Sequence, residues 1–154
     1  MGNTPKHIVA VSAVVVNDKD EMLLVKNHDR SDTWEPPGGQ VEQGEALDQA
    51  VMREVLEETG IQIKTVGITG VYYNQSSEVL SVMFKAELLS ERITIQPEEI
   101  KEARFIKITV SNIDDYITRP HIKSRTIDAM HAQNYIPYET WKVRPYELLG
   151  RLDD

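Results

Sequence analysis

The most informative segment of the chain, residues 39–61, reads GQVEQGEALDQAVMREVLEETGI. Good helix formers fill residues 46–59, and Gly60 follows them where a C-terminal cap is expected, so the segment predicts a helix that ends before Gly60. At about 100° per residue, such a helix places three carboxylates on one face within one turn. These carboxylates are Glu54, Glu57 and Glu58.

The three glutamates carry an electrostatic cost at this position. Like charges on one helix face repel one another and raise their pKa values, and negative charge is unfavourable near a helix C-terminus. A hard divalent ion such as Mg²⁺ or Mn²⁺ would remove the cost, because such ions prefer carboxylate and carbonyl oxygens. The alternative is a solvated acidic face, which is what most glutamate-rich helices are.

The spacing around the glutamates distinguishes these alternatives, because it resembles the Nudix box. That box is Gly, five residues, Glu, seven residues, then Arg-Glu-apolar-any-Glu-Glu-any-Gly-apolar. Gly39, Glu45 and residues 53–61 match every defined position. Seven positions demand one particular residue, so a chance match in such a chain is below roughly one in a million. The chain is therefore identified as a member of the Nudix family, and the Pro-Gly-Gly sequence at residues 37–39 looks most like its MutT-like branch.

The resemblance implies an α/β/α sandwich with a mixed sheet and a loop–helix–loop catalytic box. It also implies metal-dependent hydrolysis of a nucleoside diphosphate linked to another group. The metal-binding positions it implies are the Gly38 carbonyl and the carboxylates of Glu54, Glu57 and Glu58. Arg53 resembles the residue that orients these glutamates, and its i, i+4 spacing from Glu57 agrees, although an ordinary helix salt bridge has the same spacing.

The general base is left open between two places. Glu57 or Glu58 could deprotonate the attacking water from the box helix, and a later loop offers a carboxylate in other family members. Glu99 best resembles that loop acid, with Glu98 and Glu102 as rivals and a solvated acidic loop as the alternative.

Substrate contacts are less clear from the sequence. Lys26 ends a predicted strand where related proteins often place a cation against phosphate, and Arg30 or His28 could extend that patch, unless all three are plain surface charges. Tyr72 or Tyr73 could stack on a base, although packing is the role we expect.

The remainder of the chain indicates a mixed α/β layer protein. We expect strands at residues 8–16, 21–26, 61–73, 79–88 and 103–108, and helical segments at residues 112–117 and 120–133. Gly67 and Gly70 suggest a bend or bulge. Residues 34–39, with two prolines, are expected to form a rigid loop that is neither helix nor central strand. Residues 135–154 carry no clear pattern.

Composition limits the class of protein. The 154 residues predict a single domain, residues 1–154, that can bury a core without a metal or disulfide support. Without cysteine, the chain has no disulfide framework, thiolate zinc site or cysteine nucleophile. The net charge is −8, and residues 35–58 alone have a net charge of −6. The acidity therefore belongs mainly to the box.

The same numbers indicate partners and location. An acidic chain is unsuited to coating nucleic acid, and its longest apolar run, residues 8–16, is too short to span a membrane. We therefore expect a cytoplasmic protein that acts on a small nucleotide. Residues 116–151 have a basic excess that could close over an anionic substrate or form a contact in a homodimer.

The leading hypothesis is a Mg²⁺-dependent hydrolase, with Mn²⁺ as a substitute, that cleaves a phosphoanhydride bond in nucleoside triphosphates or other nucleoside diphosphate-linked compounds. One alternative is removal of pyrophosphate from RNA 5′ ends, which the acidic charge and the lack of a basic aromatic groove disfavour. Another is a Nudix-like sensor that binds a nucleotide without hydrolysing it, which the complete set of box carboxylates disfavours.

Overall fold

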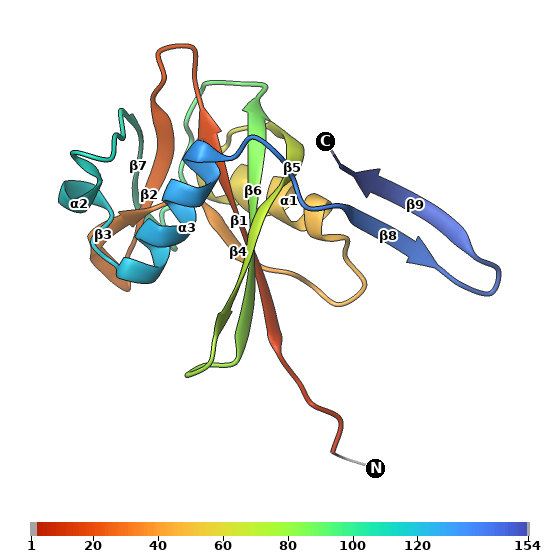
Figure 1. Cartoon of the computed structure of the whole chain (residues 1–154). Helices are drawn as coiled ribbons and strands as arrows, with labels where there is room; N and C mark the ends of the chain where they lie inside the picture. Colours follow the sequence, from red (N-terminus) through yellow and green to blue (C-terminus); the bar gives the residue numbers. More distant parts are fainter. Residues whose placement is uncertain (1–2, 154) are drawn as a thin grey trace.

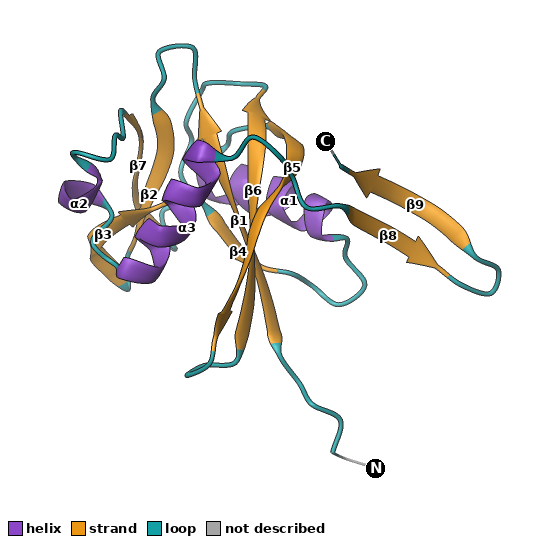
Figure 2. Ribbon diagram, viewed as in Figure 1, coloured by secondary structure: helices purple, strands orange, loops and turns teal. Residues whose placement is uncertain are grey.

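The computed structural model describes residues 3–153, in which a central sheet lies between helices on its two faces and a hairpin projects to one side (Figure 1). The sheet contains strands β1 (Ile8–Val16), β2 (Met22–Asn27), β3 (Arg30–Glu35), β4 (Gly38–Gln40), β5 (Ile63–Asn74), β6 (Val79–Leu88) and β7 (Ile100–Ile106). The helices are α1 (Leu47–Thr59), α2 (Ile113–Tyr116) and α3 (Pro120–His131), and the hairpin consists of β8 (Tyr138–Lys142) and β9 (Glu147–Leu152) (Figure 2).

The sheet is mixed because β1 and β6 pair in parallel at its centre. The main strand order is β3-β2-β1-β6-β5, with β4 also paired to β1 and β7 also paired to β2. All pairings other than β1 with β6 are antiparallel. A parallel strand is covered on both faces, which explains the unbroken apolar run at residues 8–16.

Two hydrophobic clusters fill the spaces on the two faces of this sheet. Side chains alternate across β1, so Val11, Ala13 and Val15 pack towards α1, whereas Val14 packs towards α3. The layers are therefore α1, the sheet and α3, as expected for the α/β/α sandwich. No helix within residues 3–153 is long and apolar enough to cross a bilayer.

Most sequence predictions agree with this structure, and one needs correction. Strands β1 and β6 have the predicted bounds, and register shifts occur where Gly67 and Gly70 suggested bulges. The predicted rigid loop at residues 34–39 is wrong, because β3 and β4 contain most of it. The prolines are tolerated because they fall between the two strands and not within either one. The unassigned tail forms the β8–β9 hairpin.

Close contact between β4 and β1 fixes the position of the box. A Cβ atom added at Gly38 would lie 2.1 Å from the carbonyl oxygen of Val11 and 2.7 Å from the Cα atom of Ser12. Both neighbouring atoms belong to the backbone of the central strand, so they cannot move away as a flexible side chain would. Glycine is therefore required here by space.

We predict that Gly38→Ala lowers the free energy of unfolding by about 2–3 kcal/mol through overpacking, which corresponds to a fall in Tm of roughly 4–12 °C. Gly150→Ala is the matched control, because a Cβ atom there meets nothing within 4 Å. Thermal unfolding followed by circular dichroism measures both. Equal Tm values for the two variants would contradict the argument.

Candidate active site

Helix α1 has apolar side chains that anchor it against the sheet and carries its three box glutamates near its C-terminal end. Ala50, Val51 and Val55 are completely buried against the sheet. The helix ends where expected, because Gly60 takes the left-handed conformation (φ 74°) and donates its N–H to the Leu56 carbonyl at 2.8 Å. The packing of these apolar side chains thus determines where the glutamates lie.

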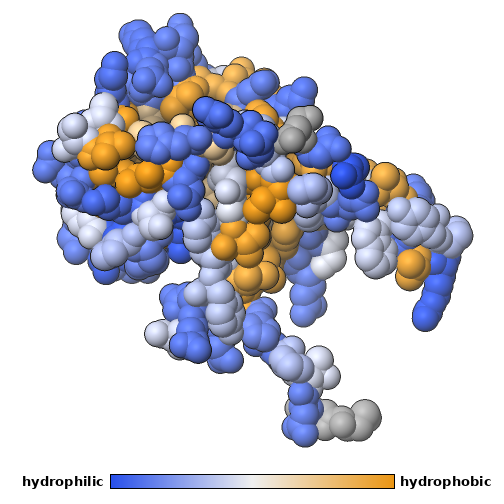
Figure 3. Space-filling model, in the orientation of Figure 1, coloured by the Kyte–Doolittle hydropathy of each residue, from blue (hydrophilic) through white to orange (hydrophobic). Residues whose placement is uncertain are grey.

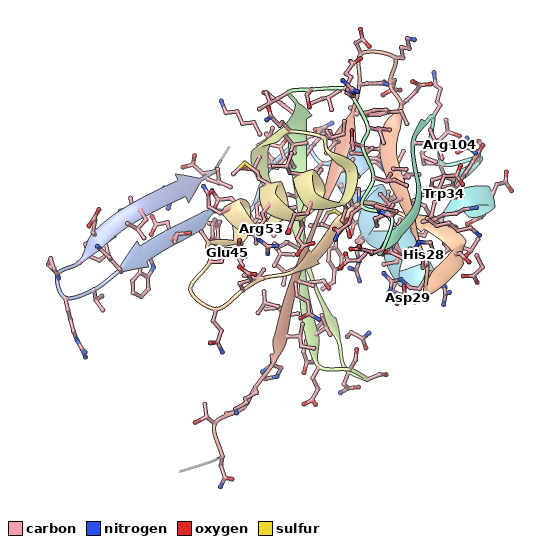
Figure 4. The ribbon with its side chains drawn as sticks, turned by 180° about the vertical axis from the view of Figure 1, so that it is seen from behind. His28, Asp29, Trp34, Glu45, Arg53 and Arg104 are labelled. Atoms are coloured by element: carbon pink, nitrogen blue, oxygen red, sulfur yellow. The ribbon has the colours of Figure 1, made fainter. Side chains whose placement is uncertain are left out.

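Arg53 binds oxygens from several parts of the box (Figure 4). Its Nε and Nη2 atoms donate to the two carboxylate oxygens of Glu45 at 2.7 and 2.9 Å. Its Nη1 donates to Glu54 at 2.9 Å and to Glu57 at 2.7 Å, and Nη2 also reaches the Gln40 carbonyl at 3.1 Å. The predicted pair with Glu57 is confirmed, and it is one part of a larger network.

Glu58 is buried without a cationic partner. Its side chain is 5% exposed, makes no ion pair within residues 3–153, and accepts a hydrogen bond from the Gly38 N–H at 3.0 Å. Burial raises the pKa of this carboxyl to about 8, against the lowering effect of the Gly38 hydrogen bond, and the charges of Glu54, Glu99 and Glu35 raise it further. Glu58 therefore carries the electrostatic cost that the sequence indicated for the three glutamates.

The other two box carboxylates lie in different surroundings. Burial raises the pKa of Glu54, and Arg53 partly offsets the rise. A Cβ atom on Gly39 would lie 2.3 Å from Glu54 Oε2, so the glycine leaves room for this carboxylate beside the backbone. The Glu57 side chain is half exposed. The site thus holds one buried, one partly buried and one accessible carboxylate.

Carboxylate oxygens are the ligands that a hard divalent ion prefers, so the three box glutamates fit such an ion. In this structure their side chains do not surround one point. Within residues 3–153, no three carboxylate or imidazole side chains are close enough together to hold a metal as they stand. Oxygens of Glu54 and Glu57 are engaged by Arg53 in this arrangement. The buried Glu58 carboxylate is the group that most needs a cation, and hard cations take carboxylate ligands.

Glu99 lies close enough to the box for its charge to act on it. Its charge raises the pKa of both Glu54 and Glu58. The loop before β7 is attached to β2 by two hydrogen bonds from His28, one from its N–H to the Glu99 carbonyl at 3.1 Å and one between its ring Nε2 and the Pro97 carbonyl at 2.7 Å. His28 therefore holds this loop, which is a different role from the phosphate contact considered above.

The two cations expected to bind substrate are in different places. The Lys26 ammonium lies over the ring of Trp34, 4.9 Å from its centroid, on the β2–β7 side of the molecule where Arg104 contacts the same ring (Figure 4). Arg30 pairs with both carboxylate oxygens of Glu35, at 3.1 and 3.0 Å. It also lines a cavity together with Gly38 and Gly39. Of the two, only Arg30 is brought to the box.

Sequence reasoning missed Arg125 as a candidate site residue. The cavity beside the box, of about 190 Å³, lies between the sheet and α3; its lining includes Ser12, Arg30, Gly38, Gly39, Met83 and Arg125. Arg125 also lines a neighbouring cavity with Tyr72 and Tyr73. The only indication in the sequence was the basic excess of residues 116–151, which does not single out one side chain.

The Arg125 guanidinium is half buried and has no carboxylate partner within residues 3–153. Its Nε donates to the His121 carbonyl at 3.1 Å, and its guanidinium carbon lies 5.4 Å from the centroid of the Tyr72 ring. Burial lowers the pKa of Arg125. Tyr72 donates its hydroxyl hydrogen to Asp128 at 2.7 Å and packs beside the second core cluster, in agreement with the expected packing role.

Comparison with known proteins gives consistent matches. The NUDIX domain model matches residues 6–122. A MutT-like protein from Streptomyces ambofaciens is 33% identical over 132 residues, which cover 78% of this chain and 84% of that protein. An ADP-ribose pyrophosphatase from Methanocaldococcus jannaschii is 31% identical over 105 residues, which cover 65% of this chain and 62% of that protein. Among solved structures, a NUDIX hydrolase from Nitrosomonas europaea has a TM-score of 0.68 and 28% identity, and the match covers 84% of this chain and 93% of that one.

We predict that Glu58→Gln stabilises the metal-free protein, because it removes a buried ionisable carboxyl and leaves an oxygen for the Gly38 N–H. The folded-state pKa of about 8 exceeds the ordinary value of 4.5, so the carboxyl costs stability as the pH rises between these values. At pH 8 in EDTA, we expect a gain of about 1–2 kcal/mol, or roughly 2–8 °C in Tm. At pH 5 the gain should disappear.

Glu57→Gln is the matched control on the same helix, because its side chain is 48% exposed. Its effect on the Tm should stay within about 0.5 kcal/mol, as for other exposed ion pairs. A lower Tm for Glu58→Gln than for the wild type at pH 8 would show that the buried carboxylate is stabilising as it stands.

Proposed function

The chain belongs to the Nudix family of hydrolases, and we propose that it cleaves a phosphoanhydride bond in nucleoside triphosphates or other nucleoside diphosphate-linked compounds. The observation that carries the proposal is the buried Glu58 carboxylate. It has no cationic side-chain partner within residues 3–153, the charges of Glu54 and Glu99 act on it, and the adjacent Gly38 lines a cavity. This arrangement has too much negative charge to receive a pyrophosphate group without a cation.

Mg²⁺, with Mn²⁺ as a substitute, is the cofactor that we propose. The Gly38 carbonyl and the carboxylates of Glu54, Glu57 and Glu58 would hold it. A bound divalent ion supplies charge neutralisation at phosphate oxygens and lowers the pKa of a water molecule. The raised pKa of Glu58 supports this assignment, because a cation beside the carboxylate would favour its charged form.

The other residues have positioning, proton-transfer and binding roles in this proposal. Arg53 holds Glu54 and Glu57 in fixed orientations through its guanidinium. Glu99 is one candidate for the base that takes a proton from water, since its charge acts on the box, and Glu57 and Glu58 are the others.

A nucleoside diphosphate part is the substrate feature that we propose for recognition. Two of the relatives are a MutT-like protein and an ADP-ribose pyrophosphatase, and the substrate named for the second contains such a part. Arg30 and Arg125 place guanidinium groups along the cavity beside the box, and guanidinium groups suit phosphate oxygens. Lys26 is not included, because its ammonium lies over Trp34.

We expect the purified protein with Mg²⁺ to turn over at least one compound in a panel of nucleoside triphosphates, nucleoside diphosphate sugars and dinucleotides. Glu57→Gln should lower kcat by about 10²–10³-fold, since each tenfold change corresponds to about 1.4 kcal/mol of transition-state stabilisation. Separation of phosphate, pyrophosphate and nucleoside monophosphate by ion-exchange chromatography identifies the scissile bond. Glu91→Gln, an exposed glutamate outside the box, is the control.

Three outcomes would contradict the proposal when 5′-triphosphorylated RNA and a nucleotide-binding measurement are added to the panel. Faster hydrolysis of 5′-triphosphorylated RNA than of any free nucleotide would identify an RNA 5′ pyrophosphohydrolase. Tight nucleotide binding without product would identify a sensor. Full activity after addition of EDTA would exclude the proposed cofactor.

A second prediction concerns the cation that the sequence did not single out. Arg125→Met should raise KM for the best substrate about tenfold or more, with a smaller effect on kcat, because the guanidinium binds the substrate and does not act on the reacting bond. Lys123→Met on the same helix is the control, since Lys123 pairs with Asp114 and lines neither cavity. Equal KM values for the two variants would remove Arg125 from the binding site.

A further inference from the structure

Arg125 lies where two cavities meet on the α3 side of the sheet. The first is the cavity beside the box. The second, of about 450 Å³, is lined by residues of α3 and of the end of β5, among them His121, Tyr72 and Asn74. Figure 3 shows hydrophilic residues along α3 and at the turn between β5 and β6. An anionic group in either cavity would lie near the same guanidinium, which suits phosphate oxygens.

A carboxylate that could neutralise Arg125 lies one turn further along α3. Asp128 follows Arg125 by three residues, and oppositely charged side chains at this spacing on a helix commonly pair. Within residues 3–153, however, the two do not pair: Arg125 donates to the His121 carbonyl at 3.1 Å, and Asp128 accepts a hydrogen bond from Tyr72. The interaction that the helix spacing favours is therefore replaced by another one.

Tyr72 contacts both charged side chains. Its hydroxyl donates to Asp128 Oδ2 at 2.7 Å, and the Arg125 guanidinium carbon lies 5.4 Å from the centroid of its ring. Burial and the neighbouring Asp128 raise the pKa of Tyr72 above its ordinary value of 10, so the hydroxyl keeps its proton and remains a donor. A ring face attracts a cation without using its N–H donors. The carboxylate is thus engaged, while the guanidinium keeps donors for a ligand.

The sheet, and not α3, determines where this hydroxyl lies. Tyr72 is in β5, opposite Ser81 of β6, and it packs beside the second core cluster. Its side chain has only two torsion angles, so it loses little conformational entropy when it holds the carboxylate. The hydroxyl is therefore a fixed donor, against which the more flexible Asp128 and Arg125 side chains arrange themselves.

We propose that Tyr72 is a positioning residue, which keeps Arg125 free to bind an anionic part of the substrate by holding Asp128 away from it. This inference rests on the proposed function, because it takes the phosphate oxygens of a nucleoside diphosphate part as the anion. Two nearby cations show the contrast, since Arg119 pairs with Asp32 at 2.9 Å and Lys123 pairs with Asp114 at 2.7 Å. A half-buried cation without a carboxylate is costly in the empty protein, and a bound anion would offset that cost.

Steady-state kinetics with the best substrate of the nucleotide panel test the proposal. Tyr72→Phe should raise KM about fivefold or more and leave kcat within about twofold, because Asp128 then pairs with Arg125. Asp128→Asn alone should leave KM near the wild-type value. The double variant Tyr72→Phe, Asp128→Asn should also return to within about twofold of it. Tyr116→Phe is the control, because Tyr116 packs beside the same core cluster and lines neither cavity.

Rescue by the second substitution separates this role from a merely structural one. An unchanged KM for Tyr72→Phe would overturn the proposal, and so would a double variant whose KM stays as high as that of Tyr72→Phe. An equal rise in KM for Asp128→Asn alone would overturn it as well, because Asp128 would then support Arg125 and not compete for it.

Thermal unfolding tests the same pairing without a substrate, so its result does not depend on what the protein hydrolyses. In the wild-type background, the Tm changes of Arg125→Met and Asp128→Asn should add to within about 1 °C. In the Tyr72→Phe background, the new ion pair should make them non-additive by about 2–4 °C. Far-ultraviolet circular dichroism verifies that each variant is folded. Additive changes in both backgrounds would overturn the proposal and leave the proposed function untouched.

Discussion

The candidate site depends on one guanidinium at the centre of the acidic box. Arg53 binds oxygens from β4, from the loop before α1 and from two turns of the helix itself. Without this cation, the glutamates of the helix end would repel one another and the glycine segment would lose its tie to the helix. Because Arg53 engages Glu54 and Glu57 but not Glu58, the network also determines which carboxylate remains uncompensated.

Gly38 and Gly39 make this arrangement possible through close packing. Gly38 lies against the backbone of β1, and Gly39 lies against the carboxylate of Glu54. The sheet therefore fixes the position of Gly38 and Gly39. The Gly38 N–H in turn donates a hydrogen bond to Glu58, which connects this segment to the helix. The rigid centre of the fold is thereby connected to the acidic end of α1 by short contacts, which suits a site that must hold its groups in defined positions.

The elements predictable from the sequence were those whose pattern is local. The apolar run of β1 and the end of α1 at Gly60 need no information from distant residues. By contrast, β3 is short and most of its own residues are polar, so only its pairing with β2 shows that it is a strand. The positions of Lys26 over Trp34 and of Arg125 beside the box depend on how β2, β3 and α3 pack, which spacing along the chain does not contain. The β8–β9 hairpin was unassigned because its aromatic residues are mostly exposed and give no core-facing alternation.

The parallel pairing of β1 with β6 has a consequence for the order of folding. Ser12 lies opposite Met83 in this pair, and residues 39–61 fall between them in the chain. During synthesis, the box segment therefore emerges before the strand that completes the centre of the sheet. Contacts across such long sequence separations form slowly. The centre of the sheet, against which Gly38 packs, is thus complete only after the whole box has been synthesised.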